Sequence, residues 1–474
     1  MTPTNADRLP FAHKVAYGVG GFVNNTLAAA ISGMLIILNL GFGMSPALVG
    51  LVAAVPRAFD ALIDPLMGFT SDRTRSRWGR RRPYIFCGAL AVGAVFALLW
   101  MIPPGRTEQF YFWYFVVGSV AFYAAYTVFA APWVALGYEL TPDYHERTRL
   151  MGVQNFIGQI AYLISPWFLW FMSNRDWFAT ITDGARALGW AVGATVAIVG
   201  IIPALVLRER SAALRQTSSG GLAGAVREFA SGFSTTLRSR PFLRLALCAL
   251  LVFNGFTMIA SFQAYVIIYY VFAGDQSRGA TFAGYAGTTG ALSAFVAISL
   301  VTWLGTRLGK KQALFVSTGI SALGHALKWF CYDPRHPWLV LLPMPLIAFG
   351  LGGLFTLVGS MIADVVDVDE LSTQQRREGM YGSTFWWIVK IGMSAALAGG
   401  GALLELTGFD VALGGGQSTR ALWLMRVIDV SVPVITSLLA LWVMHGYPIT
   451  EAQAHDVRRT LEARRTSLAT GSAA

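Results

Sequence analysis

The sequence predicts an all-α membrane protein with twelve transmembrane helices arranged in two pseudo-symmetric bundles of six. Of its 474 residues, 55% are hydrophobic and only 13% are charged, which is about half the charged share of a soluble globular protein. Apolar runs near the ~20 residues that cross a bilayer recur along the whole chain. The expected spans are 14–40, 46–69, 84–103, 109–138, 145–173, 186–207, 242–273, 279–305, 312–331, 337–363, 380–407 and 419–446.

A stretch rich in Ser, Gly and Arg, residues 208–240, separates the first six spans from the last six. It predicts a first bundle at 1–207, a cytoplasmic linker at 208–240, a second bundle at 241–447 and a polar cytoplasmic tail at 448–474. The basic loop 305–311 follows the eighth span as an Arg-rich loop at 73–82 follows the second. A matching loop in each half is expected of pseudo-symmetric halves.

Lys and Arg are concentrated in the loops on the side of the N-terminus, and the opposite loops carry Arg106, Arg175, Arg186, Arg278, Arg335 and Arg420. The positive-inside rule therefore places both termini in the cytoplasm, with the protein in the plasma (inner) membrane. The net charge of +11 is explained by this orientation. Nucleic-acid binding would need a basic soluble face, and the sequence provides none. We therefore expect the lipid bilayer to be the partner of this protein, and we expect the protein to be a monomer.

Two carboxylates, Asp60 and Asp64, stand four residues apart inside the second apolar span. On a helix this spacing puts them on one face. A charge at the bilayer centre costs about 3 kcal/mol, so a cationic species must offset them, either a protein side chain or a transported ion. For Asp60 the structural alternative is a buried ion pair with Arg57 or Lys390; for Asp64 it is a bend at the adjacent Pro65.

Residues 60–68 (DALIDPLMG) and 74–79 (TRSRWG) resemble the signature of the glycoside–pentoside–hexuronide:cation symporters of the major facilitator superfamily. Residues 132–133 on span 4, 363–367 at the end of span 10 and 389–392 on span 11 match the same family. The resemblance implies a secondary active transporter that carries a sugar or glycoside with a cation by alternating access. It is expected to be no enzyme and to have no cofactor besides the coupling ion, H⁺ or Na⁺.

By the same resemblance, Asp60 and Asp64 bind the coupling cation and Thr127 lies near it, although Thr127 could instead bond to its own helix. The sodium-using melibiose carriers have an asparagine where this chain has Ile63. Sodium is a hard cation that needs several oxygen ligands, so we expect H⁺ rather than Na⁺. No structural metal site is predicted beyond a sodium at Asp60 and Asp64.

The acids and the arginine with which melibiose carriers hold a galactoside fall on Asn25, Ala130 and Asn155. Melibiose itself is therefore not the expected substrate. A carrier of a lysolipid or another amphiphile remains an alternative, and a non-transporting sensor or scaffold is an alternative of another class.

Six residues at membrane depth are candidate substrate contacts. Asn25 and Asn155 supply amides that either bind substrate or hold helices together. Lys390 lies ten residues into span 11, about 15 Å deep. The aromatic residues Tyr126, Trp133 and Trp386 could stack on a sugar face or simply pack in the core.

Charged residues at the cytoplasmic ends of the spans are candidates for gating or structural ion pairs. The set comprises Arg57, Asp72, Arg73, Arg147, Arg149, Asp364 and Asp367. In particular, Arg147 and Arg149 could pair with Asp364, Asp367 or Glu378 and close the cytoplasmic side.

Overall fold

The computed structural model confirms an all-helical chain over the residues it describes. These are 9–74, 76–141, 144–209, 236–260, 262–373, 377–454, 456–457, 459–461 and 463. Within them, eleven helices are long and apolar enough to cross a membrane. The remaining expected span, 312–331, forms the 22-residue helix α14 (Lys310–Cys331). This helix is not among the eleven, so the count of twelve spans is not confirmed.

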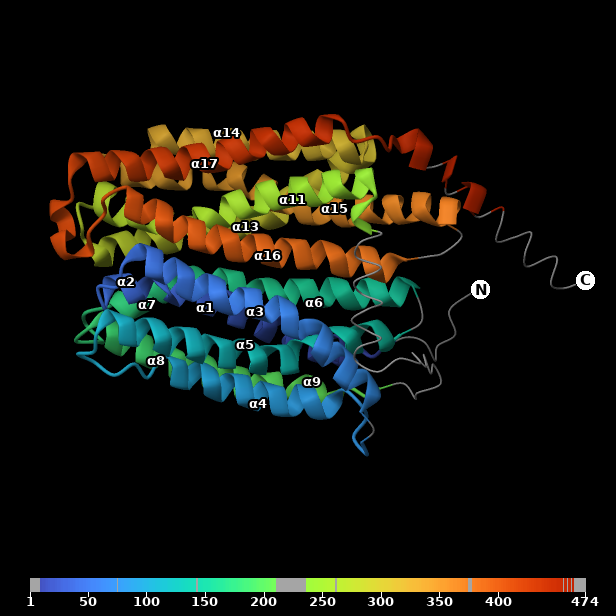
Figure 1. Cartoon of the computed structure of the whole chain (residues 1–474), viewed down its shortest axis with the longest axis horizontal. Helices are drawn as coiled ribbons and strands as arrows, with labels where there is room; N and C mark the ends of the chain where they lie inside the picture. Colours follow the sequence, from blue (N-terminus) through green and yellow to red (C-terminus); the bar gives the residue numbers. More distant parts are fainter. Residues whose placement is uncertain are drawn as a thin grey trace, which may run out of the picture. The chain divides into compact units, whose positions relative to one another are not determined.

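The described chain divides into two compact units (Figure 1). The first takes its described residues from 1–222, 261–291 and 397–425, and the second from 223–260, 292–396 and 426–474. The predicted halves, 1–207 and 241–447, are thus not identical with the units, because segments of the second half pack with the first. Most of the predicted linker, 210–235, lies outside the described residues.

The first unit contains these elements: α1 (Phe11–Met34), α2 (Ile36–Leu40), α3 (Pro46–Arg73), α4 (Arg82–Leu99), α5 (Glu108–Glu139), α6 (Tyr144–Ile164), the 3₁₀ turn Ser165–Trp167, α7 (Phe168–Ser173), α8 (Ile181–Gly200), α9 (Ile202–Val206), α12 (Phe262–Tyr265), the π-helix Val266–Val271 and the 3₁₀ turn Val411–Gly416. The second contains α11 (Arg240–Met258), α14, the 3₁₀ turn Pro337–Leu341 and α15 (Met344–Thr373). Three helices contribute residues to both: α13 (Gln276–Leu308), α16 (Glu378–Leu406) and α17 (Thr419–His445).

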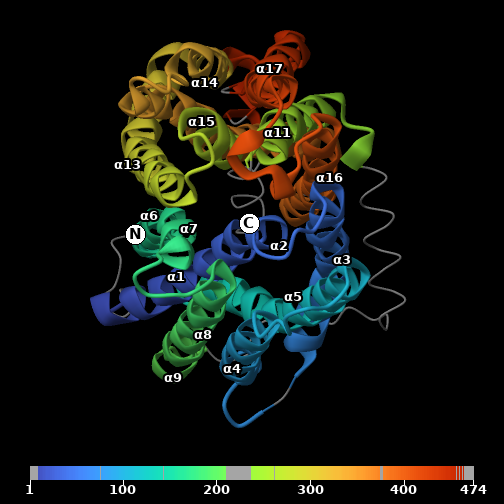
Figure 2. The same cartoon turned by 90° about the vertical axis from the view of Figure 1, so that its left-hand side faces the viewer.

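Close packing of small residues holds the first unit together. Helix α1 packs against α6, α3 against α5, and α4 against α5 and α8, as the view along the helices shows (Figure 2). A Cβ added at Gly93 of α4 would lie 2.5 Å from the carbonyl oxygen of Gly193 on α8. Without side chains at these two positions, the backbones approach closely, as is typical of helices packed in lipid.

The start of α3 shows how the sequence sets a helix end. The Ser45 hydroxyl accepts a hydrogen bond from the Leu48 backbone N–H at 3.5 Å, and Pro46 occupies the first helical position. Both residue types favour these positions because the first backbone N–H groups of a helix have no partner within it. Helix α3 then continues through Pro65 to Arg73. It carries Asp60 into the interior of the first unit.

Candidate functional site: a buried carboxylate and a polar chain

Asp60 is fully buried between α3 and α5, with 0% of its surface exposed. The Thr127 hydroxyl on α5 donates a hydrogen bond to its Oδ1 at 3.1 Å. The Arg57 guanidinium, one turn earlier on α3, lies 3.5 Å from its Oδ2. The structure therefore brings together three of the predicted residues, and the ion pair with Arg57 that the sequence left open is present. Asp64 lies one turn further along α3, and its side chain is outside the described residues.

A chain of polar and aromatic side chains leads away from this carboxylate. The Arg57 guanidinium lies 5.5 Å from the centre of the Tyr123 ring, close enough for a cation–π interaction. Tyr123 meets the Tyr126 ring edge-on at 6.2 Å. The Tyr126 hydroxyl donates a hydrogen bond to Asn24 Oδ1 at 2.7 Å. Tyr126, a predicted substrate residue, is thus connected to Asp60 through Tyr123 and Arg57.

The amides of α1 continue this polar chain towards α6. Asn24 donates to Asn25 Oδ1 at 3.3 Å, and Asn25 donates to the Gly158 carbonyl of α6 at 3.1 Å. This bond supports the helix-holding role that the sequence offered as an alternative for Asn25. Asn155, also on α6, is exposed. Substrate contact by either amide stays a prediction.

Trp133 is buried, with 3% of its surface exposed. Its indole N–H donates to the Tyr17 carbonyl at 3.2 Å. Its ring stacks on Tyr17 at 5.0 Å and lies parallel to Phe129 at 6.4 Å. This geometry favours the packing alternative for Trp133 over a stacking platform for substrate.

In the second unit, two predicted substrate residues share α16. Trp386 has 51% of its surface exposed, and its ring stacks on Phe355 of α15 at 6.1 Å. Lys390 is half-buried one turn further along α16, on the same helix face. Trp386 therefore presents an accessible ring where Trp133 does not.

Two of the residues predicted to form a gate, Arg149 and Asp364, have partners within their own units. In the first unit, Arg149 lies 3.3 Å and Lys14 lies 2.5 Å from the Glu146 carboxylate. In the second unit, Lys310 lies 2.6 Å from Asp364.

Pairing between Arg149 and Asp364 stays a prediction. Asp367 is half-buried on α15. The side chains of Asp72, Arg73 and Arg147 lie outside the described residues.

Sequence reasoning missed a second buried charge cluster. Lys328 on α14 and Asp429 on α17, exposed by 1% and 0%, form an ion pair at 2.6 Å. The Tyr332 hydroxyl donates to the same Asp429 oxygen at 2.7 Å. The sequence could have indicated this cluster, because Lys328 and Asp429 each stand inside an apolar span. A charged side chain there is costly unless it is paired.

Comparison with known proteins agrees with this fold. The family profile described as "MFS/sugar transport protein" matches residues 16–451. An uncharacterized symporter of Synechocystis is 27% identical over 97% of this chain and 98% of its own length. The isoprimeverose transporter of Lactiplantibacillus pentosus is 23% identical over 90% of this chain and 86% of its own. The sodium-dependent lysophosphatidylcholine symporter 1 of Gallus gallus is 24% identical over 96% and 90%.

Solved structures show the same fold. A nucleoside transporter, NupG, superposes with a TM-score of 0.66 at 14% identity, covering 91% of this chain and 99% of its own. A D-xylose–proton symporter gives 0.61 at 14% identity, covering 94% and 99%.

The family match and the fold together define a multi-pass membrane transporter rather than an enzyme. The chain belongs to the MFS sugar-transport family, and it is a cation-coupled symporter of that type.

Proposed function

We propose that this protein couples the transport of a sugar or glycoside to the movement of a proton, with Asp60 as the proton acceptor. The observation that carries the proposal is a completely buried carboxylate held by one hydroxyl and one guanidinium. A proton that enters and leaves Asp60 would change the charge of the site in each transport cycle.

Proton coupling is favoured over sodium coupling by the surroundings of Asp60. The Arg57 guanidinium, at 3.5 Å from Oδ2, already contacts one of the carboxylate oxygens that a sodium ion would need as ligands. A proton instead neutralises Asp60 and weakens its attraction for Arg57. Ile63 also favours proton coupling, because its side chain has no oxygen that could bind a sodium ion.

The polar chain gives this protonation a route to the substrate. When Asp60 is neutral, Arg57 is held less tightly and can shift against Tyr123, which contacts Tyr126. Tyr126 in turn donates to Asn24, and Asn24 donates to Asn25, the α1 amide that we propose as a substrate ligand. Because linkage is reciprocal, bound substrate must then favour the protonated site to the same extent. One charge moved through 100 mV yields about 2.3 kcal/mol, enough for roughly 50-fold accumulation.

The proposed substrate class rests on the family and on two relatives named as carriers of sugars. These are the isoprimeverose transporter and a putative glycoside/cation symporter of Escherichia coli, which is 24% identical over 96% of this chain. A second candidate is a lysolipid, because the sodium-dependent lysophosphatidylcholine symporters of Gallus gallus and Mus musculus are equally similar, at 24% identity.

Uptake into proteoliposomes tests the proposal. A panel of labelled sugars, glycosides and lysophosphatidylcholine is offered while proton and sodium gradients are imposed separately. We expect a sugar or glycoside to accumulate with a proton gradient alone. Asp60→Asn should abolish this accumulation but preserve exchange of substrate across the membrane, because the neutral amide imitates the protonated acid.

The matched control is Asp176→Asn, which removes an exposed carboxylate from a loop and should leave accumulation unchanged. Accumulation driven only by sodium would refute the proton assignment. Uptake of lysophosphatidylcholine with no sugar uptake would refute the substrate class.

A further inference from the structure

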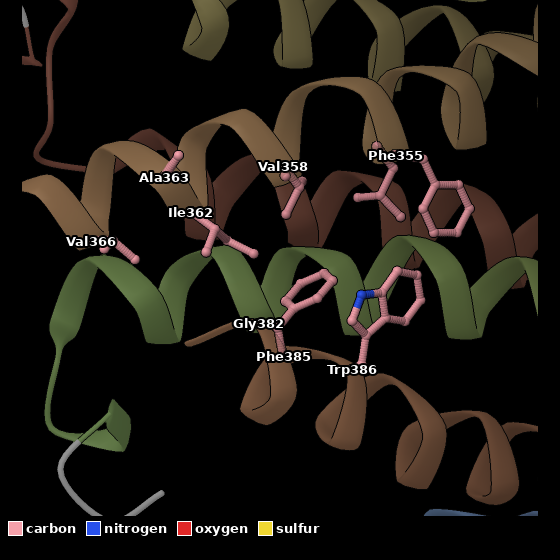
Figure 3. Close-up of a pocket in the computed structure, with 10 residues that line it drawn as sticks. Phe355, Val358, Ile362, Ala363, Val366, Gly382, Phe385 and Trp386 are labelled. Atoms are coloured by element: carbon pink, nitrogen blue, oxygen red, sulfur yellow. The ribbon is translucent and has the colours of Figure 1, made fainter. Parts of the chain in front are cut away.

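Two hollows in the second unit differ in their lining. The pocket in Figure 3, between α15 and α16, has a volume of about 230 Å³, and none of its lining residues is ionisable. The other hollow has a volume of about 660 Å³ and lies where the chain passes from α14 to α15. Its lining combines Arg335 and His336 with Trp338, three leucines and two prolines. This second hollow, the 335–345 groove, therefore offers basic side chains beside an apolar wall.

A carboxylate in the preceding turn holds the two basic residues in place. Asp333 Oδ1 accepts a hydrogen bond from the Arg335 backbone N–H at 2.9 Å, and Asp333 Oδ2 lies 2.9 Å from Nδ1 of the His336 ring. Asp333 itself does not line the groove. Arg335 is exposed, and among the residues that the structure describes its guanidinium has no hydrogen-bond or ion-pair partner. The turn thus positions Arg335 and leaves its charged group available to a ligand.

Neither membrane orientation nor packing accounts for Arg335. The positive-inside rule concentrates basic residues in cytoplasmic loops, whereas Arg335 belongs to the loops predicted to be periplasmic, which are poor in Lys and Arg. Its guanidinium is not used by the turn that holds its backbone. A basic side chain beside exposed apolar ones does match the phosphate of a lipid headgroup.

The apolar wall of the groove lies where headgroups and the first part of their acyl chains are expected. The groove is formed at the beginning of the candidate membrane span Pro337–Thr373. Trp338 and Leu342 are 60% and 58% exposed, and tryptophan is enriched at membrane interfaces. An apolar cavity of about 150 Å³ is enough to bind benzene. The groove of about 660 Å³ therefore has room for part of an acyl chain next to a phosphate.

We propose that the 335–345 groove binds an anionic phospholipid of the bilayer. Arg335 and His336 hold the phosphate, because a guanidinium can donate two parallel N–H bonds to phosphate oxygens. The acyl chain lies along Trp338 and Leu342. Phosphatidylglycerol should bind more tightly than phosphatidylcholine, because the choline cation offsets the charge of its own phosphate. The inference uses none of the residues of the proposed transport site and does not depend on the proposed function.

Photocrosslinking tests the proposal at this groove and separates it from the basic loops predicted to be cytoplasmic. The full-length protein is reconstituted in phosphatidylcholine vesicles that contain a small share of a probe lipid with a diazirine in its acyl chain. The probe is either phosphatidylglycerol or phosphatidylcholine with the same chains. After irradiation, mass spectrometry of peptides locates the label. We expect the phosphatidylglycerol probe to label residues 337–345 at least tenfold more than the phosphatidylcholine probe.

Exposed substitutions then identify the headgroup ligands. The double variant Arg335→Gln with His336→Gln should lower labelling of 337–345 by the phosphatidylglycerol probe at least fivefold, because basic residues near a membrane surface attract anionic lipid. Glutamine at 336 keeps a donor for Asp333. Labelling by the phosphatidylcholine probe should stay unchanged. The matched control is Arg420→Gln, which removes an exposed arginine on the same predicted side that does not line the groove, and it should label as the wild type does.

Three outcomes would overturn the inference. Equal labelling of 337–345 by the two probes would mean that the groove is an ordinary lipid-contacting surface without headgroup recognition. Wild-type labelling of the double variant would show that Arg335 and His336 do not hold the phosphate. Loss of the label on addition of millimolar inorganic phosphate would show that the groove binds a free anion rather than a lipid.

Discussion

At the scale of single residues, Asp60 shows how far the chemistry of a side chain constrains its role. A carboxylate with no exposed surface is tolerated only if its charge is offset, and Arg57 and Thr127 do so by an ion pair and a hydrogen bond. Neither partner was fixed by the sequence alone. Thr127 was expected near the cation through the resemblance, and its hydroxyl indeed reaches Asp60 rather than only its own helix.

Replacing Thr127 should weaken proton-driven transport. Its hydroxyl donates a hydrogen bond to the buried Asp60 carboxylate, so Thr127→Val removes one of the contacts that hold this side chain in place. A hydrogen bond to a charged group contributes about 1.5–3 kcal/mol, and we expect the initial rate of uptake into proteoliposomes to fall about tenfold or more. Thr127→Ser keeps the hydroxyl and should transport at close to the wild-type rate; an unchanged rate for Thr127→Val would contradict the role of this bond.

The two tryptophans Trp133 and Trp386 mark the limit of sequence reasoning at this scale. Both stand inside apolar spans, and the sequence offered substrate stacking or packing for each. In the structure one is 3% exposed and the other 51%. The difference arises from neighbours distant in sequence, Tyr17 in one case and Phe355 in the other, which no local pattern specifies.

At the scale of elements, α14 is a helix whose polar residues need a distant partner. Lys328, His325 and three buried hydroxyl residues, Ser317, Thr318 and Ser321, interrupt its apolar surface. Lys328 is neutralised by Asp429 on α17, about one hundred residues later. The helix therefore depends on α17 for its stability in a bilayer, since an unpaired charge is costly there.

Removing one member of this buried pair should be strongly destabilising. Lys328→Met leaves Asp429 without its counter-charge, and we expect a loss of about 3–5 kcal/mol in the free energy of unfolding. The double variant Lys328→Met with Asp429→Asn should recover most of this loss, because asparagine is uncharged and still accepts from Tyr332. Unfolding of the purified protein in detergent measures both effects.

A matched control for this pair is Arg278→Met, which removes a partner of Asp275. The two side chains are 77% and 44% exposed, so the expected loss is only about 1 kcal/mol or less. A double variant as unstable as Lys328→Met alone would contradict the explanation by unpaired charge.

At the scale of the whole molecule, the first unit contains helix ends from both halves of the sequence. At the end predicted to be periplasmic, the Tyr265 hydroxyl donates to Asn39 Oδ1 at 3.0 Å. The Trp167 indole donates to Thr288 at 2.9 Å, and the Ala47 backbone N–H donates to Glu405 at 3.1 Å. Alternating access requires these contacts to break and form again in each cycle.

Helices α3 and α16 are packed closely at this same end of the first unit. A Cβ added at Gly401 would lie 2.3 Å from the Pro46 carbonyl oxygen and 2.8 Å from the Gly50 Cα. Gly401→Val should therefore prevent this end from closing and slow uptake at least tenfold, a rise of about 1.4 kcal/mol in the barrier. Initial rates in proteoliposomes measure the effect.

Gly290→Val is the control for this substitution, because a Cβ added there meets no atom within 4 Å. It should transport at close to the wild-type rate. A wild-type rate for Gly401→Val would show that the contact need not form during transport.

The sequence by itself determined the all-helical membrane fold, the family and the buried acid at Asp60, because apolar length and a stranded charge are properties of local segments. The tertiary structure decided which partners surround that acid, which tryptophan is accessible and where α14 finds its counter-charge. It also grouped 261–291 and 397–425 with the first unit. These features depend on contacts between segments far apart in the chain, and hydrophobic periodicity carries no information about which helices meet.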